Sequence, residues 1–132
     1  MVEEAYVLLD STRRTPQIIQ HQIIRNFAKE TDLKISFYGA EFRGFESTHM
    51  QLKQYIEENN INNFLLYSIY QFYEKFNGFD IEFLEYILSK KKNIFFAAEK
   101  ISIKNEKNFR SLKHELKIAH INLKNKNSET IL

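Results

Sequence analysis

Residues 5–30 have the sequence AYVLLDSTRRTPQIIQHQIIRNFAKE, and this stretch decides the fold class. Residues 5–9 form a continuous apolar run that ends at Asp10, which predicts a buried strand opening into a loop. Thr15 and Pro16 then resemble a helix N-cap followed by proline at the first helical position. The next apolar residues recur every four positions, as a helix packed on a sheet requires: Ile19, Ile23 and Phe27. The stretch therefore predicts a strand, a loop and an amphipathic helix at residues 16–30.

The same alternation continues along the chain. Further strands are predicted at residues 33–38, 61–67 and 93–97, and further helices at residues 48–58, 81–89 and 105–124. Thr48 and Gln51 have the spacing of a capping box, whereas residues 73–80 are predicted as a loop. Regular alternation of strands and helices favours a parallel sheet covered on both faces. We therefore expect a three-layer α/β sandwich with a mostly parallel sheet of four or five strands, as in flavodoxin-like folds.

The last predicted helix differs in character from the others. Its apolar residues step by three and four positions, a heptad-like seam in a Lys- and Asn-rich sequence: Phe109, Leu112, Leu116, Ala119 and Leu123. Five seam positions are too few for an independent coiled coil, so the seam docks on its own sheet, on a second copy, or on both. We expect an α/β domain at residues 1–104, a C-terminal helix at 105–124 that takes part in forming a dimer, and a flexible tail at 125–132.

Composition excludes several classes of protein. The 132 residues include no cysteine, which removes disulfides and thiolate metal sites, and only three glycines, too few for a phosphate-binding glycine loop. The formal net charge of +2 makes nucleic acid an unlikely partner. No apolar run approaches the ~20 residues that span a bilayer, and the start of the chain is acidic at Glu3 and Glu4. We expect a soluble, cytoplasmic protein without membrane insertion.

Polar residues follow each predicted strand, and parallel strands would bring them to one edge of the sheet. Three of them are candidate catalytic residues: Ser11, Glu41 and Glu99. Either glutamate could act as a general acid or base, or could instead fix a loop. Ser11 could be a nucleophile, although no histidine lies nearby in the sequence, and capping of the loop is the alternative.

A second group of polar residues is predicted to bind the substrate. Adjacent arginines beside a helix N-terminus favour an anion such as phosphate or carboxylate. The alternatives are a solvated loop for the arginines and core packing for the aromatic residues. The candidates are Arg13, Arg14, Gln17, Gln20, Arg25, Tyr67, Ser68 and Gln71.

The histidines do not have the spacing of a metal site. His114 and His120 are six positions apart and do not share a helix face, and no H-x-x-x-H pattern occurs. No metal and no cofactor are expected.

Several separated segments resemble the sporadic carbohydrate cluster protein family. Residues 15–27 are similar to its P-Q-x-x-Q-N-x-x-I-R-D-Y pattern, residues 67–72 to its Y-S-[LI]-[FY]-Q-L segment, and residues 96–99 to F-A-x-E. The match runs from about Tyr6 to Ile103 and departs from the pattern at residues 10–11 and at His21. The resemblance implies a role in bacterial surface-polysaccharide clusters, without implying an activity.

A weaker resemblance is to the catalytic domain of serine recombinases. Residues 6–11 are similar to the start motif Y-x-R-x-S-T, but Leu8 stands at the motif arginine and Asp10 at the nucleophilic serine. The motif D-R-L-x-R has no counterpart around residues 68–72. The resemblance implies a shared, resolvase-like fold, whereas recombination itself is excluded on chemical grounds.

Three functions remain open on the sequence. The first is a protein of surface-glycan biosynthesis that binds or modifies an anionic or nucleotide-linked sugar at the strand ends, with Glu41 and Glu99 as acid and base if it is an enzyme. The second is a non-catalytic partner of an enzyme in that pathway, which predicts an exposed apolar patch on the C-terminal helix. The third is a degenerate resolvase-like protein associated with DNA.

Overall fold

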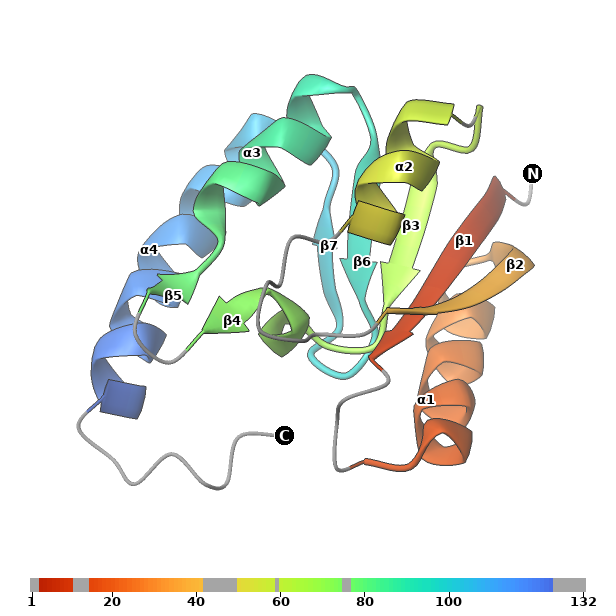
Figure 1. The fold of residues 1–132 in the computed structure, drawn as a ribbon, viewed down its shortest axis with the longest axis horizontal. Coiled ribbons are helices and arrows are strands. Elements are labelled where there is room, and N and C mark those ends of the chain that lie inside the picture. The colour runs from red at the N-terminus through yellow and green to blue at the C-terminus, as the bar shows by residue number, and fades with distance from the viewer. Residues whose placement is uncertain (1–2, 11–14, 42–49, 59, 75–76, 125–132) are drawn as a thin grey trace.

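The computed structural model describes residues 3–10, 15–41, 50–58, 60–74 and 77–124 (Figure 1). Four helices and seven strands follow one another in these ranges, together with a short 3-10 helix, η1. In chain order they are β1 (Glu3–Asp10), α1 (Gln17–Glu30), β2 (Leu33–Glu41), α2 (Met50–Glu58), β3 (Asn63–Leu66), η1 (Ile69–Phe72), β4 (Tyr73–Glu74), β5 (Gly78–Phe79), α3 (Ile81–Ser89), β6 (Asn93–Phe96), β7 (Ile101–Ile103) and α4 (Glu106–Lys124).

The main sheet has five strands in the order β2-β1-β3-β6-β7. The strands β2, β1, β3 and β6 run parallel, whereas β7 pairs antiparallel with β6 at the edge. Asp10 lies opposite Glu41 in the register of β1 and β2, and Leu66 lies between Leu8 and Phe96. The carboxyl ends of the parallel strands therefore meet at one edge of the sheet. The prediction of a mostly parallel α/β fold with a C-terminal helix is confirmed.

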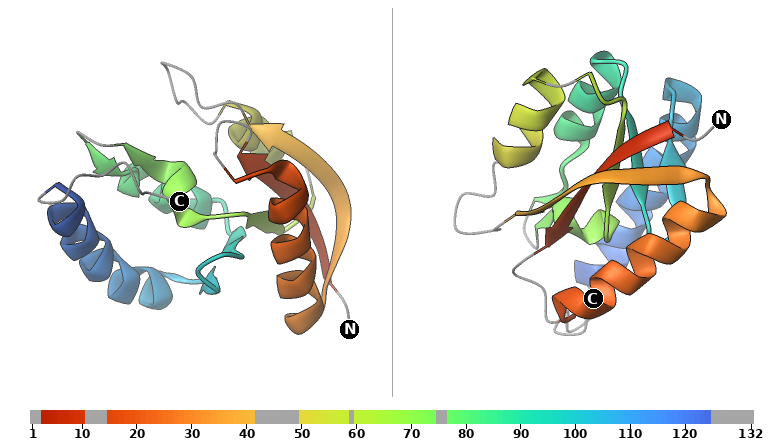
Figure 2. Two further views of the ribbon diagram at one scale, coloured as in Figure 1. Left: turned by 90° about the horizontal axis from the view of Figure 1, so that it is seen from below. Right: turned by 90° about the vertical axis from the view of Figure 1, so that its right-hand side faces the viewer.

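Strand side chains alternate between two apolar layers, because successive residues of a strand point to opposite faces. In β3, Phe64 and Leu66 face the layer built with α2, α3 and α4, whereas Leu65 faces the layer built with α1. In β6, Ile94 and Phe96 join the first layer. Figure 2 shows α1 beside the curved strand β2, far from α4 at the other end of the molecule. Both faces of the sheet are thus covered, as a fully apolar strand such as β3 demands.

Four strands differ from the sequence-based prediction: β2, β4, β5 and β7. β2 continues through Gly39, Ala40 and Glu41, which were expected to form a loop, because each of them pairs with the extended end of β1. The predicted loop at residues 73–80 contains a hairpin of β4 and β5, which form a sheet of their own. β7 was not predicted at all, since three residues are too few to show a period.

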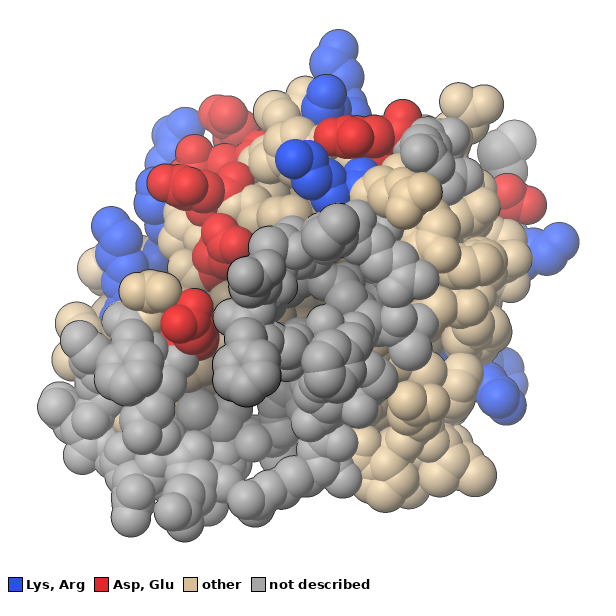
Figure 3. Space-filling view, in the orientation of Figure 1, with Lys and Arg blue, Asp and Glu red and all other residues tan. Residues whose placement is uncertain are grey.

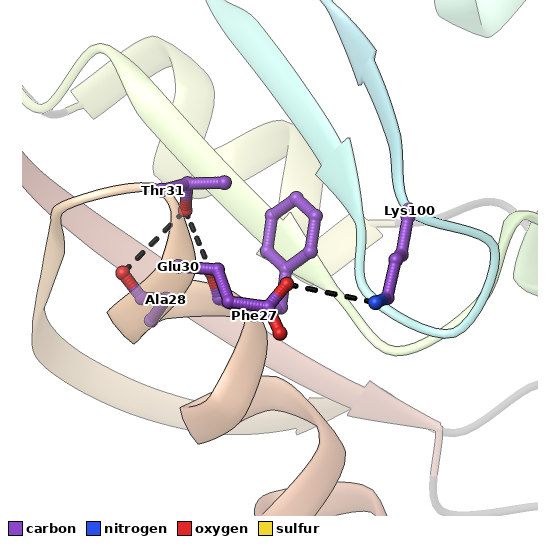
Figure 4. Close-up of polar contacts among 5 residues, drawn as sticks. All are labelled: Phe27, Ala28, Glu30, Thr31 and Lys100. Atoms are coloured by element: carbon purple, nitrogen blue, oxygen red, sulfur yellow. Dashed lines mark hydrogen bonds and ion pairs between the residues drawn. The ribbon is translucent and has the colours of Figure 1, made fainter.

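The ends of α1 are fixed by backbone geometry. Pro16 occupies the N-cap with ψ of 146° and lies just outside the helix, so the predicted N-cap at Thr15 is wrong by one position. At the other end, the Thr31 hydroxyl donates to the Phe27 carbonyl at 2.8 Å (Figure 4). Lys100, from the turn after β6, lies 3.6 Å from the Glu30 carboxylate, also drawn in Figure 4. Both of these charged side chains are more than half exposed, so their ion pair contributes little.

The seam of α4 packs on the chain's own domain. Phe109 and Leu116 are buried in the layer that also holds α2 and α3. Leu112, Ala119 and Leu123 are half-buried against the same layer. The sequence left open whether this seam docks on its own sheet or on a second copy, and the contacts place it on its own domain.

Among the described helices, none combines the length and the apolar character that crossing a membrane demands.

Candidate functional site

The strand order reverses direction between β1 and β3. From β1 the chain passes through α1 to β2 on one side, and then returns through α2 to β3 on the other side. In open parallel sheets, ligands bind at the carboxyl edge where such a reversal leaves a crevice. Here the reversal lies between the end of β1 at Asp10 and the residues that follow β3, Tyr67 and Ser68. This carboxyl edge is the candidate site.

The residues after β3 form a tight capping arrangement around Ser68. The Ser68 hydroxyl accepts a hydrogen bond from the Tyr70 amide at 3.1 Å, and the Gln71 side chain accepts from the Ser68 amide at 3.1 Å. Together they form the capping box of η1. Ser68 and Gln71 are almost completely buried. Residues 68–71 have the S-x-x-Q spacing of a capping box, so this turn could have been predicted from the sequence. The same kind of spacing at Thr48 and Gln51 predicted a capping box, but Thr48 lies outside the described residues.

Glu99, which follows β6, joins this turn. One carboxylate oxygen accepts from the Ser68 hydroxyl at 2.6 Å, and the other accepts from the Ile69 amide at 2.8 Å. Ala98 donates its amide to the Tyr67 carbonyl at 2.7 Å, so the backbones continue side by side beyond the two strands. Both oxygens of Glu99 therefore hold the β3–η1 loop, which is the loop-fixing role that the sequence left open beside acid–base chemistry.

The start of α1 supplies a third part of this edge. Gln20 is fully buried, and its side-chain amide donates to the Thr15 carbonyl at 3.0 Å. Among the described residues, no side chain caps the helix, and its first turn contains no acidic residue. Gln17 is exposed at this end. A helix N-terminus of this kind has backbone amides and a positive dipole end directed outward, which favours a negatively charged group.

The structure brings some predicted site residues together and separates others. Ser68, Gln71 and Glu99 are in direct contact, as described above. Arg25 lies eight positions beyond Gln17 on α1, about 12 Å along the helix, so it is distant from the N-terminal end where we expected it to help hold an anion. Tyr67 is buried within the layer that contains α1, so packing is the role that its position supports.

Other predicted residues are placed only in part. The backbone of Glu41 ends β2 opposite Asp10, at the candidate edge. Ser11, Arg13 and Arg14 lie outside the described residues.

Burial perturbs one tyrosine in the hairpin that follows η1. The pKa of Tyr73 is raised above its usual value, first by burial and then by the neighbouring Tyr70. The Tyr73 hydroxyl lies 3.1 Å from Nδ1 of His120, which ties the hairpin to α4. Gly78 has a φ of +79°, and the His120 ring lies 3.1 Å from the position that a Cβ would occupy, so any other residue would be strained there. No sequence pattern indicates the contact between Tyr73 and His120, which spans 47 positions.

Within the described ranges, no group of three or more His, Asp or Glu residues is arranged to hold a metal ion.

The comparison with known structures shows a likeness of fold. The N-terminal catalytic domain of TP901-1 integrase matches with a TM-score of 0.64 over 91% of this chain and 96% of that domain, at 12% sequence identity. At this identity the likeness shows a shared fold alone, which confirms the expected resolvase-like fold. No protein-family model matches the sequence, and no curated protein matches it. The resemblance to the sporadic carbohydrate cluster proteins therefore stays a prediction.

Proposed function

We propose that this protein binds an anionic sugar derivative of the nucleotide-linked class at the carboxyl edge of its sheet. The observation that carries the proposal is the reversal of strand order between β1 and β3, with Ser68 and Glu99 in contact beside it. Crevices at such reversals are the usual ligand sites of open parallel sheets. The resemblance to proteins of polysaccharide clusters supports the sugar component of the ligand.

The anionic component of the ligand is supported by the start of α1. In the described part of the chain this helix end has no side-chain cap and no acidic residue in its first turn, so a phosphate could accept hydrogen bonds from the backbone amides of Gln17 and Ile18. Arg13 and Arg14 precede the same helix by a few residues in the sequence. In this proposal they bind the anion, and the exposed Gln17 contacts a sugar hydroxyl.

Any proton transfer at this site falls to the two glutamates at the strand ends. In this proposal Glu41 acts as the acid or base, because Glu99 already accepts two hydrogen bonds from the β3–η1 loop. Glu99 contributes to proton transfer only when a ligand displaces one of those bonds.

Calorimetric titration with uridine diphosphate glucose tests the proposal. We expect wild type to bind, and Arg13→Ala to bind at least about tenfold more weakly, because a charge-assisted hydrogen bond contributes about 1.5–3 kcal/mol. Lys29→Ala, at an exposed cation in the last turn of α1, is the matched control and should bind as wild type does. No heat in either wild type or Arg13→Ala would count against a nucleotide-sugar site.

Association with DNA is a second candidate, favoured by the likeness to an integrase catalytic domain. In this alternative the chain has kept the fold and lost the nucleophile, since Leu8 and Asp10 stand where the recombinase motif has arginine and serine. Electrostatic binding to DNA weakens steeply with salt. A gel-shift series that stays flat from low to moderate salt would exclude this alternative.

A further inference from the structure

The outer face of α4 is a surface that the fold itself does not use. The seam of α4 faces the domain, so residues on the opposite side of the helix point to solvent. We define the outer face by its six exposed residues: Lys107, Arg110, His114, Lys117, Ile118 and Ile121. By helix periodicity these positions lie within about one third of the helix circumference.

Two isoleucines form the apolar part of this face. Ile118 is 47% exposed and Ile121 is 57% exposed, and a spacing of three positions makes them neighbours on the helix surface. Neither belongs to the buried layers of the domain. A partner-binding role predicts an exposed apolar patch on the C-terminal helix. Ile118 and Ile121 form such a patch, whereas the seam residues of α4 pack against the domain.

The charges along this face are mostly positive. Lys117 lies next to Ile118, whereas Arg110 and Lys107 lie about 12 and 16 Å before it along the helix, and none of the three forms an ion pair with a carboxylate in the described part of the chain. Two acidic residues of α4 flank the face, Glu106 near Arg110 and Glu115 one turn before Ile118. Figure 3 shows the basic residues along the outline at the left, where α4 runs, and acidic residues in front of them over α3. A second copy of this face would bring like charges together, which disfavours self-association through it.

We propose that the outer face of α4 binds an amphipathic helix of another protein that carries acidic residues beside an apolar stripe. The three cations complement the acidic residues, and Ile118 and Ile121 pack against the stripe. A nucleic acid would satisfy the cations but would leave both isoleucines in contact with water or phosphate, so a protein partner fits the face better. The face is remote in sequence from the carboxyl edge and goes beyond the proposed ligand site.

Fluorescence anisotropy with synthetic helices tests this proposal on the full chain. The probe is a labelled peptide of about three heptads with leucine at the a and d positions and glutamate elsewhere, and a lysine-substituted peptide is its opposite-charge counterpart. At about 0.15 M salt we expect saturable binding of the acidic peptide alone. The double variant I118D/I121D should weaken it at least about tenfold, and R110E/K117E should weaken it by a similar factor.

Matched variants separate this face from nonspecific binding. Tyr38→Ser alters an exposed apolar side chain on β2, and K29E/K34E reverses two exposed cations elsewhere. Both should bind the acidic peptide as wild type does, and thermal unfolding should show that all variants fold. Equal binding of the acidic and basic peptides, or no effect of I118D/I121D, would overturn the proposal. The proposal would also be overturned if duplex DNA bound more tightly than the acidic peptide and I118D/I121D did not weaken that binding. A dimer in analytical ultracentrifugation that Ile121→Asp dissociates would overturn it as well.

Discussion

The two edges of the sheet are held together by different chemistry. At the amino edge, Asn63 is buried and donates to the Glu4 carbonyl at 3.0 Å, and Asn93 donates to the Asn63 side chain at 2.9 Å. At the carboxyl edge, the half-buried carboxylate of Glu99 binds Ser68 and the Ile69 amide. Asn63 also donates to the Glu3 carboxylate at 3.2 Å, so the amino edge is organised around a buried amide, whereas the carboxyl edge is organised around a half-buried carboxylate. At the amino edge the buried side chain joins neighbouring strands, whereas at the carboxyl edge the carboxylate fixes the loop beside the proposed ligand site.

The largest effect is expected at the amino edge. Asn63→Ala removes three partly buried hydrogen bonds, to the Glu3 carboxylate, the Glu4 carbonyl and the Asn93 side chain, and each contributes about 0.5–1.5 kcal/mol. We expect the free energy of unfolding to fall by about 3 kcal/mol in urea titrations. Nucleotide-sugar binding measured below the unfolding transition should not change. A loss of ligand affinity in this variant would show that the two edges do not act separately.

A smaller loss of stability is expected at the carboxyl edge. Glu99→Gln keeps the size of the side chain but removes its charge, and one of its two terminal atoms can no longer accept a hydrogen bond. We expect the free energy of unfolding to fall by about 1–2 kcal/mol, together with weaker ligand binding, because the β3–η1 loop is less fixed. The control is Glu30→Gln, at an exposed ion pair, which should change stability by less than about 0.5 kcal/mol. Equal effects of the two variants would contradict the role of Glu99.

Most strands and helices could be predicted from the sequence, but the long-range contact at the carboxyl edge could not. The apolar runs and helix periods predicted every parallel strand, and α3 has the predicted bounds, Ile81–Ser89. The contact between Ser68 and Glu99 could not be derived in the same way, because it spans 31 positions and depends on the pairing of β3 with β6. The hairpin of β4 and β5 was missed because two-residue strands show no alternation.

The smallest effect on stability is expected from a contact between α2 and α3, and it appears only at high pH. The Tyr86 hydroxyl donates to the Glu57 carboxylate at 2.5 Å, and burial followed by this hydrogen bond raises the pKa of Tyr86 to about 12. Because the folded pKa exceeds the unfolded one of 10.0, this contribution to stability is complete below pH 10.0 and is lost as the pH rises to about 12.

Urea unfolding over this pH range checks the Tyr86 contribution. In wild type, we expect the free energy of unfolding to fall as the pH rises from 10.0 to about 12. Tyr86→Phe should lack the part of this fall that Tyr86 causes, whereas Tyr38→Phe, at an exposed tyrosine, should show the same fall as wild type. A decline that is identical in wild type and Tyr86→Phe would exclude the contact as its cause.

Backbone amide NMR during titration with uridine diphosphate glucose tests the ligand site most directly. We expect the signals of Gln17, Ile18 and Ile69 at the carboxyl edge to shift progressively and saturate, while those of Asn63 and Asn93 at the amino edge stay in place. Shifts that cluster at the amino edge or on α4, or no shift at millimolar ligand, would contradict it.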